Sequence, residues 1–210
     1  MKELNIIFKE FEKHMLEDEK PSKYFNKIIA ENWFISSYPF NLIADLVKTQ
    51  QSPIHHPEGN VWKHTMMVLD NAAERRMQSE DPRSFMWAAL LHDLGKAQST
   101  KLKNGRITSY DHDKTGEEMT IKFLKCFEVD EKFIYDVSKL VRWHMQILFV
   151  NKDLPFANIK SMAKETSIRE VALLGTCDRL GRGEMDLLKA KDEMLNIEIF
   201  IKKCESYISN

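Results

Sequence analysis

Hydrophobic residues recur at spacings of three and four along most of this chain, which is the pattern of amphipathic α-helices. Glycine and proline, the residues that most often interrupt helices, number only 7 and 6 among 210 residues. The sequence therefore predicts an all-α fold. We expect helices over residues 2–16, 21–31, 39–50, 60–78, 84–95, 112–127, 131–149, 158–165, 167–179 and 185–208. The Asn-Gly pair at 104–105 predicts a small hairpin or an exposed loop.

The length of the chain suits one domain with a sizeable buried core. We expect a catalytic helical bundle over residues 51–210, with an N-terminal helical extension, residues 1–50, packed on it. The clearest boundary between the two is segment 51–59, which contains helix-breaking prolines and two histidines and leads into the helix predicted from residue 60.

Charge and hydrophobicity exclude several classes of protein. The 31 basic and 32 acidic residues give a net charge of -1, so no global positive field attracts nucleic acid or an anionic membrane, and any phosphate binding must be local. Residues 2–16 read as an amphipathic helix and not as a signal peptide, and no apolar run approaches the roughly 20 residues that span a bilayer. We expect a cytoplasmic protein with no membrane partner. Its three cysteines, an odd number, indicate reduced thiols.

Four side chains that can bind metals lie on the apolar faces of four predicted helices: His64, His92, His144 and Asp178. A single histidine on such a face is usually a core residue that hydrogen-bonds a backbone carbonyl. Aspartates, however, are costly to bury unless they are paired or bind a cation, and Asp93 and Asp178 have only Lys96 as an obvious counter-charge. Together these residues predict a metal site.

The adjacent pair His92-Asp93 has a further chemical use, because the imidazole binds one ion while the two carboxylate oxygens can bridge two. We expect one ion to be held by His64, His92, Asp93 and Asp178, and a second by Asp93, His112 and His144. Mixed imidazole and carboxylate ligands suit Mn, Fe, Co, Ni or Zn. Two such ions beside two carboxylates leave a charge of about +2, which binds a phosphate ester and activates a water as nucleophile.

Lys96 follows His92 by four residues and so lies on the same helical face. Three roles are open for it: it binds a phosphoryl oxygen, it neutralises Asp93, or it lies at a solvated helix end. Gly95, which precedes it, is interpreted as the C-cap of the helix.

Three further histidines are less constrained by spacing. His112 is expected at the N-terminus of a helix with Asp113 as a cap, where it is either a metal ligand or an exposed loop residue. His55 and His56 lie in a proline-flanked loop, and we interpret them as surface or gate residues.

These residues resemble a known family. His64, the pair His92-Asp93 and Asp178 are similar to the H…HD…D signature of the HD-domain metal-dependent phosphohydrolases. Longer segments resemble the C-terminal HD domain of bacterial CCA-adding tRNA nucleotidyltransferases: PIHHPEGNVWKHTMMVLD at 53–70, ALLHDLGK at 89–96, GRIT at 105–108, HDKTG at 112–116 and DRLGR at 178–182. Residues 21–25 and 38–40 resemble the helices that precede that domain. The resemblance covers residues 20–190.

The resemblance implies an HD-domain helical bundle with the hydrolytic activities of that family: metal-dependent phosphatase, 2′-nucleotidase or 2′,3′-cyclic phosphodiesterase, acting on a nucleotide or RNA-end phosphate. The nucleotidyltransferase head of that family, with its Gly-Ser and Asp-x-Asp motifs, has no counterpart in this sequence, so we do not expect CCA addition. The resemblance also supports His112 and His144 as ligands. It leaves Arg182 either as a contact to the substrate phosphate or as a salt bridge.

Two other functions stay open. Some HD proteins with this ligand set hold two irons and activate oxygen, and the HD fold can also persist as a non-catalytic RNA-binding or regulatory module. The lysine-rich segment 101–106 favours a phosphorylated substrate.

Overall fold

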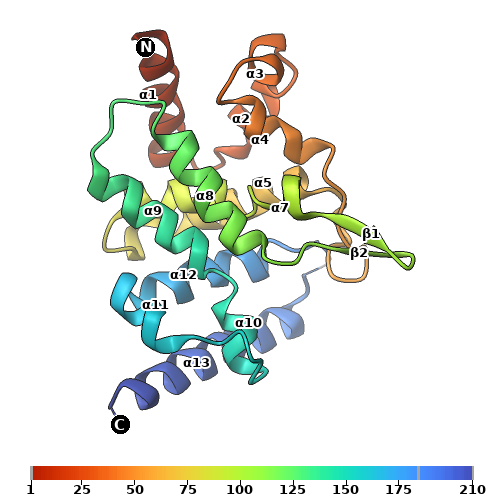
Figure 1. The fold of residues 1–210 in the computed structure, drawn as a ribbon, viewed down its shortest axis with the longest axis vertical. Helices are drawn as coiled ribbons and strands as arrows, with labels where there is room; N and C mark the ends of the chain where they lie inside the picture. The colour runs from red at the N-terminus through yellow and green to blue at the C-terminus, as the bar shows by residue number, and fades with distance from the viewer. Residues whose placement is uncertain (1, 184, 210) are drawn as a thin grey trace.

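A computed structural model describes residues 2–183 and 185–209. Its helices, drawn in Figure 1, are α1 (Lys2–Glu17), α2 (Ser22–Ile28), α3 (Asn32–Ser36), α4 (Asn41–Ala44), α5 (Val61–Arg75), α6 (Pro82–Leu91), α7 (Lys96–Ser99), α8 (His112–Leu124), α9 (Glu131–Trp143), α10 (Gln146–Asn151), α11 (Ile159–Glu165), α12 (Ile168–Leu180) and α13 (Leu187–Ser209). Two short 3-10 helices, η1 (Asp45–Val47) and η2 (Arg76–Gln78), extend α4 and α5. The two strands are β1 (Lys101–Lys103) and β2 (Arg106–Thr108). The predicted all-α fold class is confirmed.

The helices are arranged around α5 and α6 in the middle of the molecule. Helices α1 to α4 lie at the end that carries the N-terminus, and α10 to α13 lie at the opposite end (Figure 1). Helix α5 packs against α6 and α12, while α8 packs against α9. Helix α6 also contacts α9 and α12, so the segments that carry the candidate site residues meet near the centre of the bundle.

One continuous hydrophobic core joins the N-terminal helices to the rest of the chain. Phe8 and Phe11 of α1 are buried, and the ring of Phe8 stacks on Trp87 of α6 with 4.4 Å between ring centroids. Buried aromatic side chains contribute the largest share of apolar area to such a core. The contacts of α1 therefore help to hold α6, the helix that ends at His92, in place.

The helices begin where the sequence offers side-chain caps. Asn60 accepts a hydrogen bond from the backbone N–H of Lys63 at the start of α5, and Asp130 accepts one from Phe133 at the start of α9. Asp81 caps α6, with Pro82 in the first turn, where its missing N–H costs nothing. Helix α6 therefore begins two residues before the predicted start.

The ends of two predicted helices are wrong. The helix predicted over 84–95 ends at Leu91, and the helix predicted over 131–149 is interrupted after Trp143 and resumes as α10. The residues at these breaks are His92 and His144, both candidate ligands. The short α3 and α7 were not predicted, and the segment 39–50 forms α4 and η1 in place of one longer helix.

The Asn-Gly pair forms the turn of a hairpin. Strands β1 and β2 pair antiparallel, with Leu102 opposite Ile107, and the turn residues Asn104 and Gly105 have positive φ angles of 50° and 71°. Two positive φ angles are typical of a type I′ turn, which the Asn-Gly dipeptide favours. In the part of the chain that the structure describes, no helix is long and apolar enough to cross a membrane.

Candidate functional site

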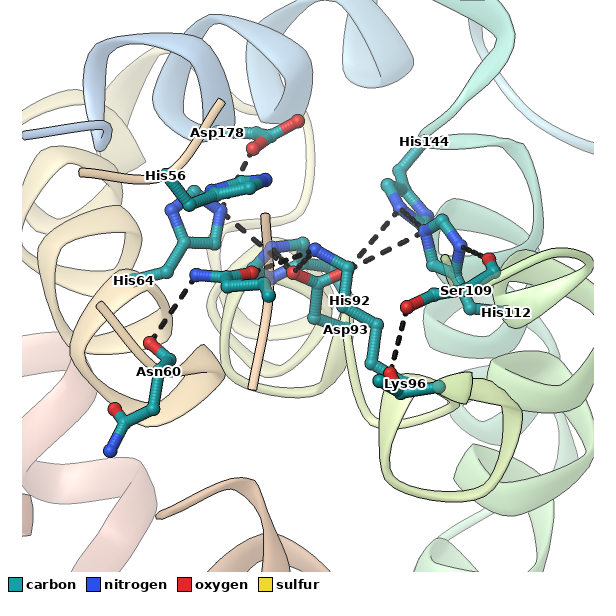
Figure 2. A network of polar contacts seen from close by, with 12 residues as sticks. His56, Asn60, His64, His92, Asp93, Lys96, Ser109, His112, His144 and Asp178 are labelled. Atoms are coloured by element: carbon teal, nitrogen blue, oxygen red, sulfur yellow. Dashed lines mark hydrogen bonds and ion pairs between the residues drawn. The ribbon is translucent and has the colours of Figure 1, made fainter. Parts of the chain in front are cut away.

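The structure brings the six predicted metal-ligating side chains together. His64 comes from α5, His92 and Asp93 follow α6, His112 begins α8, His144 follows α9, and Asp178 lies in the last turns of α12 (Figure 2). His64, His92, Asp93 and His144 are no more than 3% exposed, and His112 is 7% exposed. All six belong to one polar cluster within the apolar bundle.

Three of the histidines share one local arrangement. The Nδ1–H of His92 donates to the carbonyl of Ala89, that of His144 to Val141, and that of His112 to Ser109. Each acceptor lies three residues earlier, and the distances are 2.9, 2.6 and 2.7 Å, respectively. Because a carbonyl can only accept, Nδ1 carries the proton and Nε2 of each neutral ring keeps a free lone pair.

This arrangement explains why the helices break at His92 and His144. The last carbonyls of a helix lack backbone partners, and a side-chain donor can satisfy one of them. His92 and His144 use their own Nδ1–H for this purpose at the ends of α6 and α9. The same bond fixes the orientation of each ring, and the Nε2 atom then points into the cluster.

Asp93 lies at the centre of the cluster (Figure 2). Its Oδ2 is 3.3 Å from Nε2 of His92 and 3.8 Å from Nε2 of His64. Its Oδ1 is 3.6 Å from Nε2 of His112 and 3.9 Å from Nε2 of His144. The two carboxylate oxygens therefore face two different groups of histidines, as the sequence predicts for a bridging ligand.

Lys96 is buried against Asp93 and is not at a solvated helix end. Its Nζ lies 2.7 Å from Asp93 Oδ2 and donates a hydrogen bond of 3.1 Å to Oε1 of Gln51. Lys96 therefore neutralises Asp93, one of its three predicted roles. Gln51 was not predicted as a site residue.

The other side of the cluster is organised by Glu58. Nε2 of His64 lies 3.0 Å from Asp178 Oδ1, while Nδ1 of the same ring lies 2.9 Å from Oε1 of Glu58. This Glu58 oxygen also accepts from Nδ1 of His56 at 2.8 Å, and the second Glu58 oxygen accepts from the N–H of Gly183 at 3.0 Å. Glu58 thus holds the loop before α5 against the segment after α12.

The environment keeps both central carboxylates ionised. Burial raises the pKa of Asp93, but Lys96 and His92 outweigh it and hold that pKa well below its usual value. Burial likewise raises the pKa of Asp178, and the hydrogen bond from His64 and the charge of Arg182 reverse this effect. Both side chains are therefore in the deprotonated form that binds cations.

The imidazoles that face Oδ1 of Asp93, those of His112 and His144, are kept neutral. Burial lowers the pKa of His112, despite the opposing charge of Asp93. Burial, together with the neighbouring His112 and His92, lowers the pKa of His144 to about 4. A neutral ring is the form that ligates metals. His64 differs, because Asp178 and Glu58 outweigh the burial that lowers its pKa and raise that pKa overall.

The donor set fits divalent metal ions. Nε2 of His112 and Nε2 of His144 lie 3.2 Å apart, although both carry lone pairs when Nδ1 is protonated. Two nitrogens bound at about 2.05 Å to one tetrahedral ion would be about 3.3 Å apart. Nε2 of His92 is buried and has no hydrogen-bond partner among the described residues. The fully buried groups His64–His92–Asp93 and Asp93–His112–His144 each offer three ligand atoms within 4.8 Å of one another.

Gly95 has a different role from the predicted helix C-cap. Its φ angle of -65° is right-handed, so no left-handed conformation requires glycine here. A Cβ atom at this position would lie 2.1 Å from the carbonyl oxygen of His112 and 2.5 Å from the backbone nitrogen of Gly116. Glycine allows the segment after Asp93 to touch the first turn of α8, which brings His112 next to Asp93.

A cavity of about 610 Å³ opens onto the cluster. Asp93, Lys96, His112, His144 and Asp178 line its floor, together with apolar residues of α10. Arg182 also lines it, with Nη2 3.9 Å from Asp178 Oδ2, which is beyond hydrogen-bonding distance. The cavity suits a ligand of nucleotide size.

One prediction about a neighbouring residue is wrong. Asp113 does not cap α8: the residue before the helix is Asp111, and the Asp113 carboxylate pairs with Arg142. Of the two alternatives for His55 and His56, surface or gate residues, His56 is not a surface residue, because it is half-buried and bonded to Glu58, whereas His55 is exposed; both line the cavity. Glu58 and Gln51 lie in a segment without helical periodicity, so no facing argument identifies them from sequence.

Comparison with known proteins agrees with this geometry. The model of the HD domain family matches residues 61–182, more than half of the chain, and the chain belongs to this family. HD domains bind divalent metals and define a family of metal-dependent phosphohydrolases. The matched region contains all six residues of the cluster. The division of the chain at residue 50 stays a prediction.

The relatives are multifunctional CCA proteins, which confirms the resemblance described from the sequence. The protein of that name from Methylococcus capsulatus is 40% identical over 200 residues, which is 95% of this chain and 40% of that protein. The one from Halorhodospira halophila is 51% identical over 96 residues, 45% of this chain and 21% of that protein. The one from Actinobacillus pleuropneumoniae is 43% identical over 47 residues, 22% of this chain and 11% of that protein. The chain thus spans at most 40% of the length of these relatives.

Proposed function

We propose that this chain hydrolyses a phosphomonoester or a cyclic phosphodiester on a nucleotide or an RNA end. The observation that carries the proposal is the position of Asp93, whose two oxygens face two groups of buried imidazoles, of which His92, His112 and His144 keep free Nε2 lone pairs. A carboxylate in this position is suited to bridge two cations. Two cations are suited in turn to a reaction in which negative charge develops on a phosphoryl group.

The proposed ligands of the first ion are His64, His92, Asp93 and Asp178, and those of the second are Asp93, His112 and His144. When bound, divalent ions such as Mn, Fe, Co, Ni or Zn would act as Lewis acids toward a phosphoryl oxygen and lower the pKa of water at the site. The backbone carbonyls bonded to Nδ1 orient three of these ligands, and Glu58 orients His64.

Lys96 and Arg182 are the proposed phosphate-binding residues. An ammonium has three N–H donors, and Lys96 donates one of them to Gln51 while it forms an ion pair with Asp93. A further donor is available to a phosphoryl oxygen in the cavity that Lys96 lines. The Arg182 guanidinium contacts Asp178 only loosely, so its donors can pair with a second phosphoryl oxygen.

The substrate class is proposed from the cavity and from the relatives. A volume of about 610 Å³ accommodates one nucleotide. The relatives are named multifunctional CCA proteins. The resemblance described from the sequence implies the activities of a phosphatase, a 2′-nucleotidase or a 2′,3′-cyclic phosphodiesterase.

A hydrolysis panel tests this function. Metal-loaded protein is assayed on 2′,3′-cyclic nucleotides, 2′- and 3′-mononucleotides, dinucleoside polyphosphates and guanosine tetraphosphate, beside His92→Ala and Asp93→Ala. We expect one substrate of the first two classes to dominate, and both variants to lose activity while their melting temperatures stay near that of the wild type. Failure to hydrolyse any 2′,3′-cyclic, 2′- or 3′-substrate would refute the proposal. Oxygen consumption with a mixed-valence spin signal would assign the site to an oxygenase.

A further inference from the structure

The β1–β2 hairpin concentrates positive charge on one of its faces. Its register places Lys103 opposite Arg106 and Lys101 opposite Thr108, and side chains of paired residues lie on the same face of a sheet. Residues 94–110 include four basic side chains and no acidic one, in a chain whose net charge is -1. The hairpin is therefore a local basic feature of an otherwise balanced molecule.

These charges have no partners in the structure. Lys101, Lys103 and Arg106 are exposed, and their side chains form no ion pair with the described residues 2–183 and 185–209. Elsewhere exposed lysines do pair, as Lys132 does with Asp136. Like charges directly opposite each other destabilise a strand pair. An anion bound between Lys103 and Arg106 would remove this repulsion.

An aromatic side chain lies beside the basic face. Tyr110 is 75% exposed, and it lines a hollow of about 430 Å³ together with Lys103, Asn104, Arg106 and Thr108. Exposed aromatic rings next to basic side chains are the elements with which proteins hold single-stranded nucleic acids, because bases stack on the ring while the cations contact the phosphates.

The same strand also borders the candidate active site. Side chains alternate along β2 and the residues after it, so Ile107 and Ser109 line the 610 Å³ cavity while Arg106, Thr108 and Tyr110 line the hollow. The hairpin projects from the helical body (Figure 1), and Ile107 of β2 lies in the lining of this cavity. A substrate that is longer than one nucleotide would meet the hairpin as it leaves the cavity.

We propose that the hollow formed by Lys103, Arg106 and Tyr110 binds nucleotides of a single-stranded polynucleotide whose terminal phosphate occupies the cavity. This inference rests on the proposed function and deepens it, because it makes a polynucleotide end the preferred substrate over a free nucleotide. The two basic side chains contact the backbone, and the Tyr110 ring stacks on a base.

Binding of a fluorescein-labelled RNA of ten nucleotides that ends in a 3′-phosphorothioate, a slowly hydrolysed analogue of the terminal phosphate, tests the proposal by fluorescence anisotropy on the metal-loaded full chain. The double variant Lys103→Ala/Arg106→Ala is expected to weaken binding at least tenfold and to reduce the slope of log K against log salt by about 1.4, which is 0.7 for each lost phosphate contact. The matched control is Lys160→Ala/Lys164→Ala on α11, away from the hairpin in Figure 1; it removes the same charge and should change binding less than twofold.

Tyr110→Ala separates stacking from charge. We expect it to weaken binding about fivefold or more without changing the salt slope, and Tyr110→Phe to retain wild-type binding. Hydrolysis gives a second readout. Wild type and hairpin double variant are compared on an RNA that ends in a 2′,3′-cyclic phosphate and on the cyclic mononucleotide. We expect the preference for the RNA, measured as the ratio of the two kcat/KM values, to fall about tenfold in the double variant.

The two proposals fail in different ways. If the wild type hydrolyses cyclic mononucleotides but binds the RNA no better than the hairpin double variant does, the hairpin proposal is wrong and the proposed function stands. Equal weakening by the hairpin and control variants also overturns it. If RNA binds through the hairpin but no phosphate ester is hydrolysed, the proposed function is wrong and hairpin binding is supported.

Discussion

Glu58 is expected to control metal binding without being a metal ligand, and Glu58→Gln tests this. The side chain is 4% exposed. It accepts hydrogen bonds from Nδ1 of His56 and the N–H of Gly183, and its Oε1 lies 2.9 Å from Nδ1 of His64. An amide of the same shape cannot satisfy all three. If its NH₂ faces Gly183, two donors oppose each other. If it faces the histidines, Nδ1 of His64 must give up its proton, and the proton of the neutral ring stays on Nε2, which donates to Asp178 in this structure.

The second outcome would hold that proton on Nε2, the atom that must release it before His64 can bind an ion as proposed. The loss of one hydrogen bond to a charged group corresponds to about 1.5–3 kcal/mol. Loss of a carboxylate that orients a ligating histidine weakens metal affinity about 10- to 100-fold. Converted to free energy, this factor is close to the cost of the lost hydrogen bond. We therefore expect the tighter Mn²⁺ dissociation constant of Glu58→Gln to rise by 10- to 100-fold.

Isothermal titration of metal-depleted protein with Mn²⁺ provides the assay. His56→Ala removes the neighbouring donor but leaves the contact between Glu58 and His64, and its affinity should change less than threefold. Glu118→Gln, at an exposed carboxylate of α8, controls for the loss of one negative charge. If Glu58→Gln bound Mn²⁺ as tightly as Glu118→Gln does, the orienting role of Glu58 would be refuted.

Three further predictions address the surroundings of the site. Gly95→Ala should cost about 3 kcal/mol and lower the melting temperature by about 6–12 °C, because the new Cβ meets backbone atoms of the first turns of α8. In Gly105→Ala the new Cβ meets no atom within 4 Å, so this variant should cost about 1 kcal/mol, and equal melting temperatures of the two variants would contradict the prediction. Lys96→Met should lower kcat/KM for the phosphate ester at least tenfold, because the proposed phosphate contact is lost. The same variant should bind Mn²⁺ more tightly, because Asp93 loses the cation that competes with the metal. Unchanged kinetics would exclude a phosphate contact by Lys96. In the native protein only Cys126 should react with a thiol reagent below pH 9. Burial raises the pKa of the other two cysteines, Cys177 and Cys204, to about 12. Rapid labelling of a second thiol would contradict this prediction.

Helical periodicity was sufficient to predict which polar side chains point inward. His64, His144 and Asp178 share faces with apolar residues at spacings of three and four, and the structure places all three in the cluster. Periodicity reports only which face a residue occupies. It therefore gives the fold class and most of the candidate site.

The remaining features depend on contacts between distant segments. Glu58 lies in an aperiodic loop, and its partner Gly183 is 125 residues away. The need for glycine at position 95 likewise comes from α8 packed against it. No local pattern in the sequence encodes these contacts. The break of α6 at His92 is different, because the side-chain bond to Ala89 spans only three residues; helical periodicity does not reveal it, since periodicity reports only which face a residue occupies.

The central claim is that divalent ions held around Asp93 are required for hydrolysis of a phosphate ester. The most direct measurement is the rate of hydrolysis of 2′,3′-cyclic nucleotide by metal-depleted protein as Mn²⁺ is added, with bound metal quantified in the same samples. We predict no hydrolysis without metal and a rate that saturates when one to two ions are bound per chain, with neither binding nor hydrolysis in Asp93→Ala. Hydrolysis that persists in the metal-depleted protein, or metal binding that Asp93→Ala leaves unchanged, would contradict the claim.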